Sequence, residues 1–232
     1  MTVEKKLPFA SDYQQGAHPR ILERLSAANM EANPGYGTDA HSEHARELIR
    51  TACNAPQAEV HFLVGGTQAN TVAIDALLAP WQGVVAADSG HVSIHEAGAI
   101  EACGHKVIQL PEKDGKLNAA DVDALATSWE QDENHDHMVM PGLVYISQPT
   151  EYGTLYSLDE LSALRATCDA HGMKLYVDGA RLAYALAAPR NNVQLSDLAR
   201  LADAFYIGGT KCGALLGEAM VFPKPSTCPH FF

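Results

Sequence analysis

Several features are missing from this 232-residue sequence, and each absence excludes a class of protein. No apolar stretch approaches the roughly 18 residues that a membrane-spanning helix needs. No run of Lys or Arg is present and the net charge is -12, which argues against nucleic acid or an anionic membrane surface as a partner. The dinucleotide fingerprint G-x-G-x-x-G is also absent, which argues against a nucleotide-binding protein of the Rossmann type.

Cysteines are few and lack paired spacing. The five are Cys53, Cys103, Cys168, Cys212 and Cys228, an odd number without the spacing of a disulfide framework or a zinc site. They indicate reduced thiols and predict a cytoplasmic protein. The first residues, "MTVEKKLPFASDY", contain no apolar signal core, so no export is expected. In "ENHDHM", His135 and His137 flank an aspartate, but a polar loop predicts a solvated turn and no metal site.

Short apolar runs alternate with helical patterns along the chain. Because the strands are continuous apolar runs, they predict an α/β fold with three α/β/α layers and a mostly parallel sheet. Thr67 is expected to cap one helix and Pro80 to end it, and Ser157 with Glu160 forms a capping box. The expected strands are 59–66, 83–88, 105–110, 142–147, 174–178 and 204–209, and the expected helices are 41–53, 67–80, 93–104, 118–129, 157–172 and 194–201.

Polar and glycine residues follow several of these strands, where ligands bind in parallel sheets. "GGTQAN" places Gly66 and Thr67 at a helix start that suits a phosphate, although a plain turn has the same pattern. "YVDGAR" ends a strand with Asp178 and adds Arg181, which alone is typical of a structural ion pair. Lys211 lies between two apolar runs, where a lysine can act as an amine nucleophile.

Together these parts match the needs of a pyridoxal phosphate site. Such a site combines a lysine that carries the cofactor covalently with an acidic partner for the pyridine nitrogen and a phosphate cradle. We therefore predict that Lys211 binds the cofactor aldehyde, that Asp178 holds the pyridine proton, and that Gly66 and Thr67 hold the phosphate.

The motifs that carry this site also resemble a known family, the low-specificity L-threonine aldolases of the fold type I pyridoxal-phosphate enzymes. The likeness covers nearly the whole chain and several motifs occur in the family's order. These motifs are "FASDY", "GYGTD", "GGTQANTVAI", "SGHVSIHEAGAIEACGHKV", "TEYGTLYSLDEL", "VDGARL" and "GGTKCGALLGEAMVF".

The resemblance implies roles for particular residues. His91 matches a histidine stacked on the cofactor ring near the substrate hydroxyl, and Thr210 a residue that reaches the phosphate. Ser11 and Arg181 match groups near the substrate carboxylate, with Arg181 also near the ring hydroxyl. Tyr36 lies in a matching motif without a firm role. Residues 1–40 would form an arm that contributes to the site, and residues 41–232 the large cofactor-binding domain.

The implied reaction is cleavage of L-threonine, or a related β-hydroxy-α-amino acid, to glycine and an aldehyde. His91 is the first candidate to take the hydroxyl proton and His95, four residues on, the second. Alternatives stay open: a β-eliminating lyase, or a truncated chain that folds without turnover. Family members continue into a small C-terminal domain, so the resemblance implies that this domain is absent here. It also implies a homodimer or homotetramer.

Overall fold

A single seven-stranded sheet runs through the computed structural model, which describes residues 9–231. Its strand β7 runs antiparallel to both neighbours, and all other neighbouring strands pair in parallel. The expected mostly parallel sheet is therefore confirmed. In sheet order the strands are β1 (Glu59–Leu63), β7 (Glu218–Phe222), β6 (Ala204–Gly208), β5 (Lys174–Asp178), β4 (Met140–Ser147), β2 (Gln82–Ala87) and β3 (Val107–Leu110).

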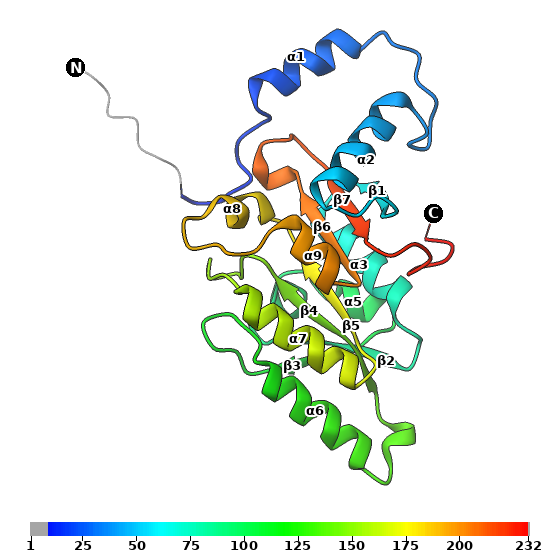
Figure 1. Ribbon diagram of the computed structural model, residues 1–232, viewed down its shortest axis with the longest axis vertical. Helices are drawn as coiled ribbons and strands as arrows, with labels where there is room; N and C mark the ends of the chain where they lie inside the picture. The colour runs from blue at the N-terminus through cyan, green and yellow to red at the C-terminus, as the bar shows by residue number, and fades with distance from the viewer. Residues whose placement is uncertain (1–8, 232) are drawn as a thin grey trace, which may run out of the picture.

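Helices cover both faces of the sheet and give the predicted three layers (Figure 1). One face packs against α6 (Ala119–Gln131), α7 (Leu158–Ala170), α8 (Leu182–Ala187) and α9 (Leu195–Leu201). The other face packs against α3 (Gly66–Leu77), α4 (His91–Ile94) and α5 (Ala99–Ala102). Two short 3₁₀ turns connect some of these elements: η1 (His135–His137) lies between α6 and β4, and η2 (Thr210–Cys212) between β6 and β7.

The two-sided cover explains why the strands lack apolar alternation. In β2, Val85 and Ala87 enter the core beneath α6 and α7, whereas Val84 and Ala86 enter the core beneath α3. Both sets are buried, so every position of the strand favours an apolar residue.

The N-terminal helices contribute little to this packing, although Ile49 packs against the core. Helix α1 (Pro19–Ala28) has no buried residue and stands off from the sheet, and α2 (Ala40–Ala52) follows beside β1 and β7 (Figure 1). The helix expected over 41–53 is confirmed as α2, yet its apolar face is largely open, with Leu48 58% exposed. Of the predicted arm, residues 1–8 lie outside the described residues.

Three local expectations are wrong. The helix expected over 93–104 is broken into α4 and α5, because Ala97 (φ 51°) and Gly98 (φ 74°) adopt left-handed conformations. Thr67 does not cap α3, since that helix begins at Gly66 with Gly65 as its N-cap. Pro80 also lies beyond the helix end at Leu77. The elements α1, α8 and β7 were not expected, whereas the capping box of Ser157 and Glu160 is confirmed.

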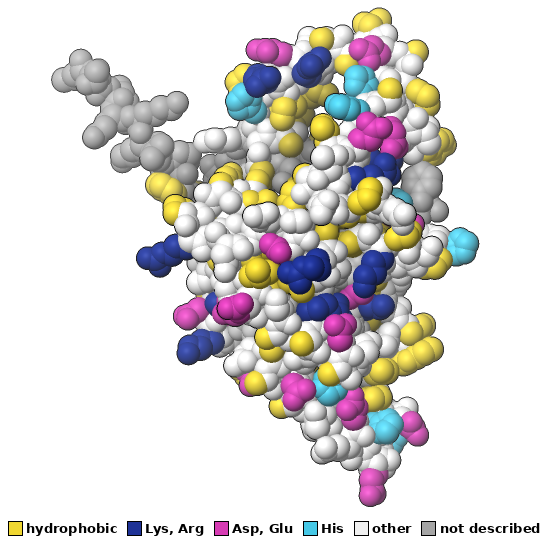
Figure 2. All heavy atoms as spheres, in the orientation of Figure 1, with side chains coloured by type: hydrophobic (Ala, Val, Ile, Leu, Met, Phe, Trp, Pro, Cys, Tyr) yellow, Lys and Arg dark blue, Asp and Glu magenta, His cyan; other side chains and the backbone are white. Residues whose placement is uncertain are grey.

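No helix within residues 9–231 is long and apolar enough to cross a membrane. The same residues contain no cluster of three or more His, Cys, Asp or Glu that could hold a metal ion. On the face drawn in Figure 2, Lys and Arg side chains are interspersed with acidic ones.

Candidate active site

A cavity of about 290 Å³ opens at the carboxyl ends of the central strands. The residues that line it come from segments far apart in the chain. All seven residues expected to bind the cofactor are among them: Gly66, Thr67, His91, Asp178, Arg181, Thr210 and Lys211. Because a parallel sheet brings its strand ends to one edge, the topology explains this convergence.

Asp178 ends β5 and is buried with four hydrogen-bond donors around its carboxylate. Oδ1 accepts from the Tyr206 hydroxyl at 2.6 Å and from the Ala180 amide at 2.9 Å. Oδ2 accepts from the Tyr145 hydroxyl at 2.6 Å and from the Asn70 amide at 2.9 Å. Burial raises the pKa values of both tyrosines, so they remain neutral donors. The donors fix the carboxylate at the wall of the cavity.

The N-terminus of α3 supplies the amide groups that an anion requires. Gly65 gives α3 no side-chain cap, and Ala69 is the residue whose amide makes the first backbone bond, to the Gly65 carbonyl. Within residues 9–231, the Gly66 and Thr67 amides have no protein acceptor. A Cβ atom on Gly66 would lie 3.0 Å from the Tyr206 hydroxyl oxygen, so glycine keeps this wall open.

His91 begins α4 and points one ring nitrogen away from solvent. Its Nδ1 lies 2.8 Å from Oε1 of Glu96, whose side chain is fully buried. The hydrogen bond to Glu96 raises the pKa of His91, burial opposes the change, and the charges of Asp178 and Glu151 add to the rise. The ring therefore favours the protonated form more than a free imidazole does.

Arg181 contacts two carboxylates of the chain itself. Its guanidinium pairs with Asp12 through Nε and through Nη2 at 3.3 Å, and Nη1 lies 3.6 Å from Glu151. Burial disfavours both charges, but the Asp12 contact outweighs it and raises the pKa of Arg181, while Arg181 lowers that of Asp12. The N-terminal arm thus reaches the cavity through Asp12.

Lys211 lies on η2 and forms no ion pair within the described part of the chain. Its Nζ lies 5.9 Å from the centre of the Tyr13 ring, and its carbonyl accepts from the Tyr184 hydroxyl at 2.8 Å. The sequence indicates an ammonium group without an ion-pair partner, and this is confirmed for the described residues. Tyr13 of the N-terminal arm and Tyr184 of α8 thus both contact this turn.

Glu218 is a buried acid beside this lysine that the sequence motifs did not reveal. It accepts from the Thr210 hydroxyl at 2.8 Å and from the Gly209 amide at 3.1 Å. Burial raises the pKa of Glu218, and the charge of Lys211 opposes that rise. The Thr210 hydroxyl, expected at the phosphate, therefore donates to Glu218 in this structure.

The other candidates lie farther out. Ser11 lines an adjoining cavity of about 300 Å³ that shares Thr210 and Lys211 with the first. Tyr36 is 89% exposed and does not line either cavity. His95, the second candidate for the hydroxyl proton, follows the end of α4 and is exposed, with its ring centre 5.5 Å from that of His91. His135 instead stacks on Trp129, with ring centres 4.6 Å apart.

Some residues of the site could not be expected from a strand-end motif. Tyr13 and Asp12 come from the N-terminal arm, and Glu151 lies in the turn after β4. Asn70 reaches the site from within α3, and Glu96 from the turn between α4 and α5. A buried polar residue in an apolar helix, as Asn70 is in α3, was the one signal available in the sequence.

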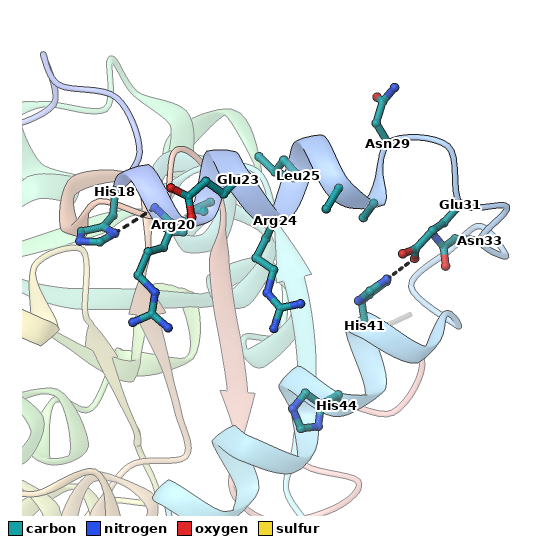
Figure 3. Close-up of a pocket in the computed structure, with 13 residues that line it drawn as sticks. His18, Arg20, Glu23, Arg24, Leu25, Asn29, Glu31, Asn33, His41 and His44 are labelled. Atoms are coloured by element: carbon teal, nitrogen blue, oxygen red, sulfur yellow. Dashed lines mark hydrogen bonds and ion pairs between the residues drawn. The ribbon is translucent and has the colours of Figure 1, made fainter.

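A larger hollow of about 1590 Å³ lies between α1 and α2, away from these residues (Figure 3). Side chains from both helices line this hollow: Arg20 and Arg24 from α1, and His41 and His44 from α2. His41 Nε2 lies 2.7 Å from Oε2 of Glu31. Its lining is mostly exposed. It contains no residue predicted for catalysis or cofactor binding.

The chain is similar to several known proteins. The profile of the family described as Beta-eliminating lyase matches residues 8–225. A low-specificity L-threonine aldolase of Pseudomonas aeruginosa is 36% identical over 221 residues, which are 92% of this chain and 61% of the relative. The threonine aldolase structure of Leishmania major has a TM-score of 0.88 and 47% identity over 94% of this chain and 64% of that one.

A more distant structure shows the same fold. Cystalysin of Treponema denticola, described as containing pyridoxal 5'-phosphate, has a TM-score of 0.70 at 16% identity. The chain belongs to the β-eliminating lyase family, and its fold is that of the fold type I enzymes expected from the resemblance. It spans 61% and 64% of the lengths of the two threonine aldolases it matches.

Proposed function

We propose that the protein is a pyridoxal-phosphate-dependent aldolase that cleaves L-threonine or a related β-hydroxy-α-amino acid to glycine and an aldehyde. The observation that carries the proposal is the convergence of Lys211, Asp178, His91 and the amide-rich start of α3 on one cavity. The threonine aldolases matched by the chain support the choice of reaction.

The residues present fit the cofactor. Gly66 and Thr67 offer unpaired amides for a phosphate at the positive end of α3, and Gly66 leaves the room that a side chain would fill. Asp178 offers a fixed carboxylate for the pyridine nitrogen, and Lys211 offers an amine free of an ion pair for the aldehyde. Thr210 lines the same cavity.

When bound, pyridoxal phosphate accepts the electron pair left on Cα as the Cα–Cβ bond breaks. The chain's own residues orient the substrate for this step. Arg181 binds the substrate carboxylate with Ser11 nearby, so that carboxylate takes over contacts that Asp12 now makes. His91, through the ring nitrogen that does not contact Glu96, takes the β-hydroxyl proton during cleavage and returns it in the reverse direction.

The N-terminal arm, residues 1–40, contributes to this site, and residues 41–232 form the cofactor-binding domain. Asp12 and Tyr13 support the arm's role within the described residues. We further propose a small amino-acid substrate, assembly with at least a second copy as a homodimer or homotetramer, and a cytoplasmic location. Five cysteines without disulfides support a reducing compartment.

The proposal is tested by titrating the purified chain with pyridoxal phosphate and following absorbance. Borohydride reduction followed by peptide mass spectrometry should place the cofactor on Lys211 and leave Lys211→Ala unlabelled. Lys174→Ala and Lys224→Ala serve as matched controls that keep the label. A label on Lys174 or Lys224 of the unchanged chain would refute the assignment.

Turnover then separates the candidate reactions. Release of glycine and acetaldehyde from L-threonine supports the aldolase. Release of pyruvate from L-cysteine, or of phenol from L-tyrosine, without cleavage of L-threonine supports a β-eliminating lyase instead. A chain that binds the cofactor on Lys211 and turns over none of these would be a folded remnant without activity.

A further inference from the structure

The break between α4 and α5 places a buried acid, Glu96, next to His91. In a continuous helix, residues five positions apart lie about 140° from each other around the axis, so Glu96 would face away from His91. Helix α4 instead ends at Ile94, and Glu96 lies in the turn that continues through the left-handed residues Ala97 and Gly98 to α5. Glu96 can therefore place Oε1 2.8 Å from Nδ1 of His91, with its side chain fully buried.

Asn70 fixes this acid from the other side. Its Nδ2 donates to Oε1 of Glu96 at 2.6 Å and to Oδ2 of Asp178 at 2.9 Å. Its Oδ1 accepts from the Tyr176 hydroxyl at 3.0 Å, and burial raises the pKa of Tyr176, which keeps this phenol a donor. The tyrosine thus sets the orientation of the amide, and both amide hydrogens point at carboxylates.

The charges around His91 favour a proton on its ring. The second Glu96 oxygen, Oε2, is buried and has no hydrogen-bond partner among residues 9–231. A buried carboxylate of this kind is costly unless a cation lies beside it, and His91 is in direct contact with it. Asp178 and Glu151 add negative charge, whereas Lys211 and Arg181 line the same cavity and the His95 ring lies 5.5 Å away.

We propose that Glu96, oriented by Asn70, is a positioning residue that holds His91 as an imidazolium with Nδ1 toward Glu96 and Nε2 toward the cavity. For the proposed cleavage, His91 must first lose its Nε2 proton before it can take the one from the β-hydroxyl. In the reverse direction the imidazolium gives this proton to the aldehyde oxygen as the carbon–carbon bond forms. Glu96 thereby sets the pH at which His91 changes between these roles, a deduction that rests on the proposed function.

The first test needs neither cofactor nor activity. The chain labelled with ¹⁵N-histidine is titrated by NMR, and His91→Asn identifies the His91 signals. We expect His91 to titrate above its ordinary value with Nδ1 protonated, and Glu96→Gln to lower its titration point by about one to three pH units. Glu101→Gln, an exposed acid on the neighbouring α5, should leave it unchanged.

Glu96→Asp covers the case in which Glu96→Gln does not fold, because it keeps the charge but is too short to hold the same contact. Glu96→Asp should lower the titration point of His91 by less than Glu96→Gln does. If His91 in the unsubstituted chain titrates at or below its ordinary value, the proposal is overturned. A titration point that moves equally in Glu96→Gln and Glu101→Gln would also overturn it.

The second test concerns the reaction. If L-threonine is cleaved, the acidic limb of the rate against pH should lie at the His91 titration point and shift with it in Glu96→Gln. A limb that stays in place while the NMR titration point moves would show that His91 does not handle the hydroxyl proton. An absence of cleavage in every variant counts against the proposed function and leaves the NMR result to decide the role of Glu96.

Discussion

Four hydrogen-bond donors surround the Asp178 carboxylate. Replacing one of its oxygens by an amide nitrogen therefore removes an acceptor that two donors use. In Asp178→Asn, the new amide group meets the Tyr145 or Tyr206 hydroxyl in place of an acceptor oxygen. We expect a loss of about 1–3 kcal/mol in the free energy of unfolding. Urea unfolding followed by circular dichroism measures this loss.

The same variant should still bind pyridoxal phosphate but lose turnover, because a neutral amide cannot hold the pyridine proton. Asp88→Asn is a matched control, since Asp88 follows the neighbouring strand β2 but is exposed. Its stability and cofactor binding should be unchanged. Normal turnover by Asp178→Asn would rule out the carboxylate as the partner of the pyridine nitrogen.

At the residue scale, the sequence predicts groups that follow strands and misses groups that arrive by packing. Asp178, Lys211 and Gly66 follow strand ends, where the parallel topology makes convergence expected. Glu96 and Glu218 reach the same site because of a helix break and an antiparallel strand. Neither feature has a residue pattern that marks it in advance.

Gly179, the residue directly after β5, approaches β6 so closely that no side chain fits at this point. A Cβ atom on Gly179 would lie 1.8 Å from the Tyr206 carbonyl oxygen, and backbone cannot move aside without disturbing the pairing of the sheet. We expect Gly179→Ala to lower the free energy of unfolding by about 3 kcal/mol or more.

Gly35→Ala is the control for this prediction, because a Cβ atom at Gly35 meets nothing within 4 Å. Its free energy of unfolding should change by less than about 0.5 kcal/mol. If Gly179→Ala and Gly35→Ala unfold at the same urea concentration, the close approach of Gly179 to β6 is not as described.

Helices α6 and α7 are joined by a histidine that contacts two acids. His171, at the end of α7, places Nδ1 2.7 Å from Glu130 and Nε2 2.8 Å from Asp123 on α6. The hydrogen bonds to Asp123 and Glu130 raise the pKa of His171. The stabilisation is therefore complete below the unfolded-state pKa of about 6.5 and is lost as pH rises through the raised folded-state value.

We expect His171→Gln to lower the free energy of unfolding by about 0.5–1 kcal/mol at pH 6, because the partner acids are partly exposed, and by less at pH 9. Urea unfolding at both pH values measures the difference. His137→Gln, an exposed histidine of η1, should show no such dependence. A loss in His171→Gln that is equal at both pH values would contradict the assignment.

At the element scale, the sequence predicts strands and long helices correctly and fails where backbone conformation is set by context. The strands of the parallel part are apolar on both faces, which is a strong signal. The break between α4 and α5 includes Ala97 at φ 51°, and alanine gives no warning of a left-handed conformation. Helix α1 has no buried residue, so its apolar positions are not explained by the core of one chain.

At the scale of the whole molecule, strand order depends on pairing between distant segments. β1 lies at one edge beside β7, so the first strand of the sheet pairs with the last. A local pattern predicts β1 but β7 was not expected, and no local pattern gives the order of the strands. The fold class was therefore predictable from the sequence, whereas the edge formed by β1 and β7 was not.

Exposed apolar residues on α1 suggest how whole molecules associate. Leu22 and Leu25 are 50% and 53% exposed, on a helix with no buried residue beside the hollow of Figure 3. Burying a leucine stabilises an interface by about 1.5–3 kcal/mol, and a charge in its place would have to be buried instead. We expect the chain to form a dimer or larger assembly, and the double variant Leu22→Lys, Leu25→Lys to dissociate at least about tenfold more readily.

Sedimentation velocity over a range of protein concentrations measures this change, and circular dichroism checks that the helices remain. Met138→Lys is the control, because Met138 is 44% exposed but lies directly after η1, in a different part of the chain from α1. It adds one lysine charge away from α1 and should leave association unchanged. Equal dissociation of the double variant and the unchanged chain would exclude α1 from the interface, and a chain that stays monomeric at every concentration would refute the proposed assembly itself.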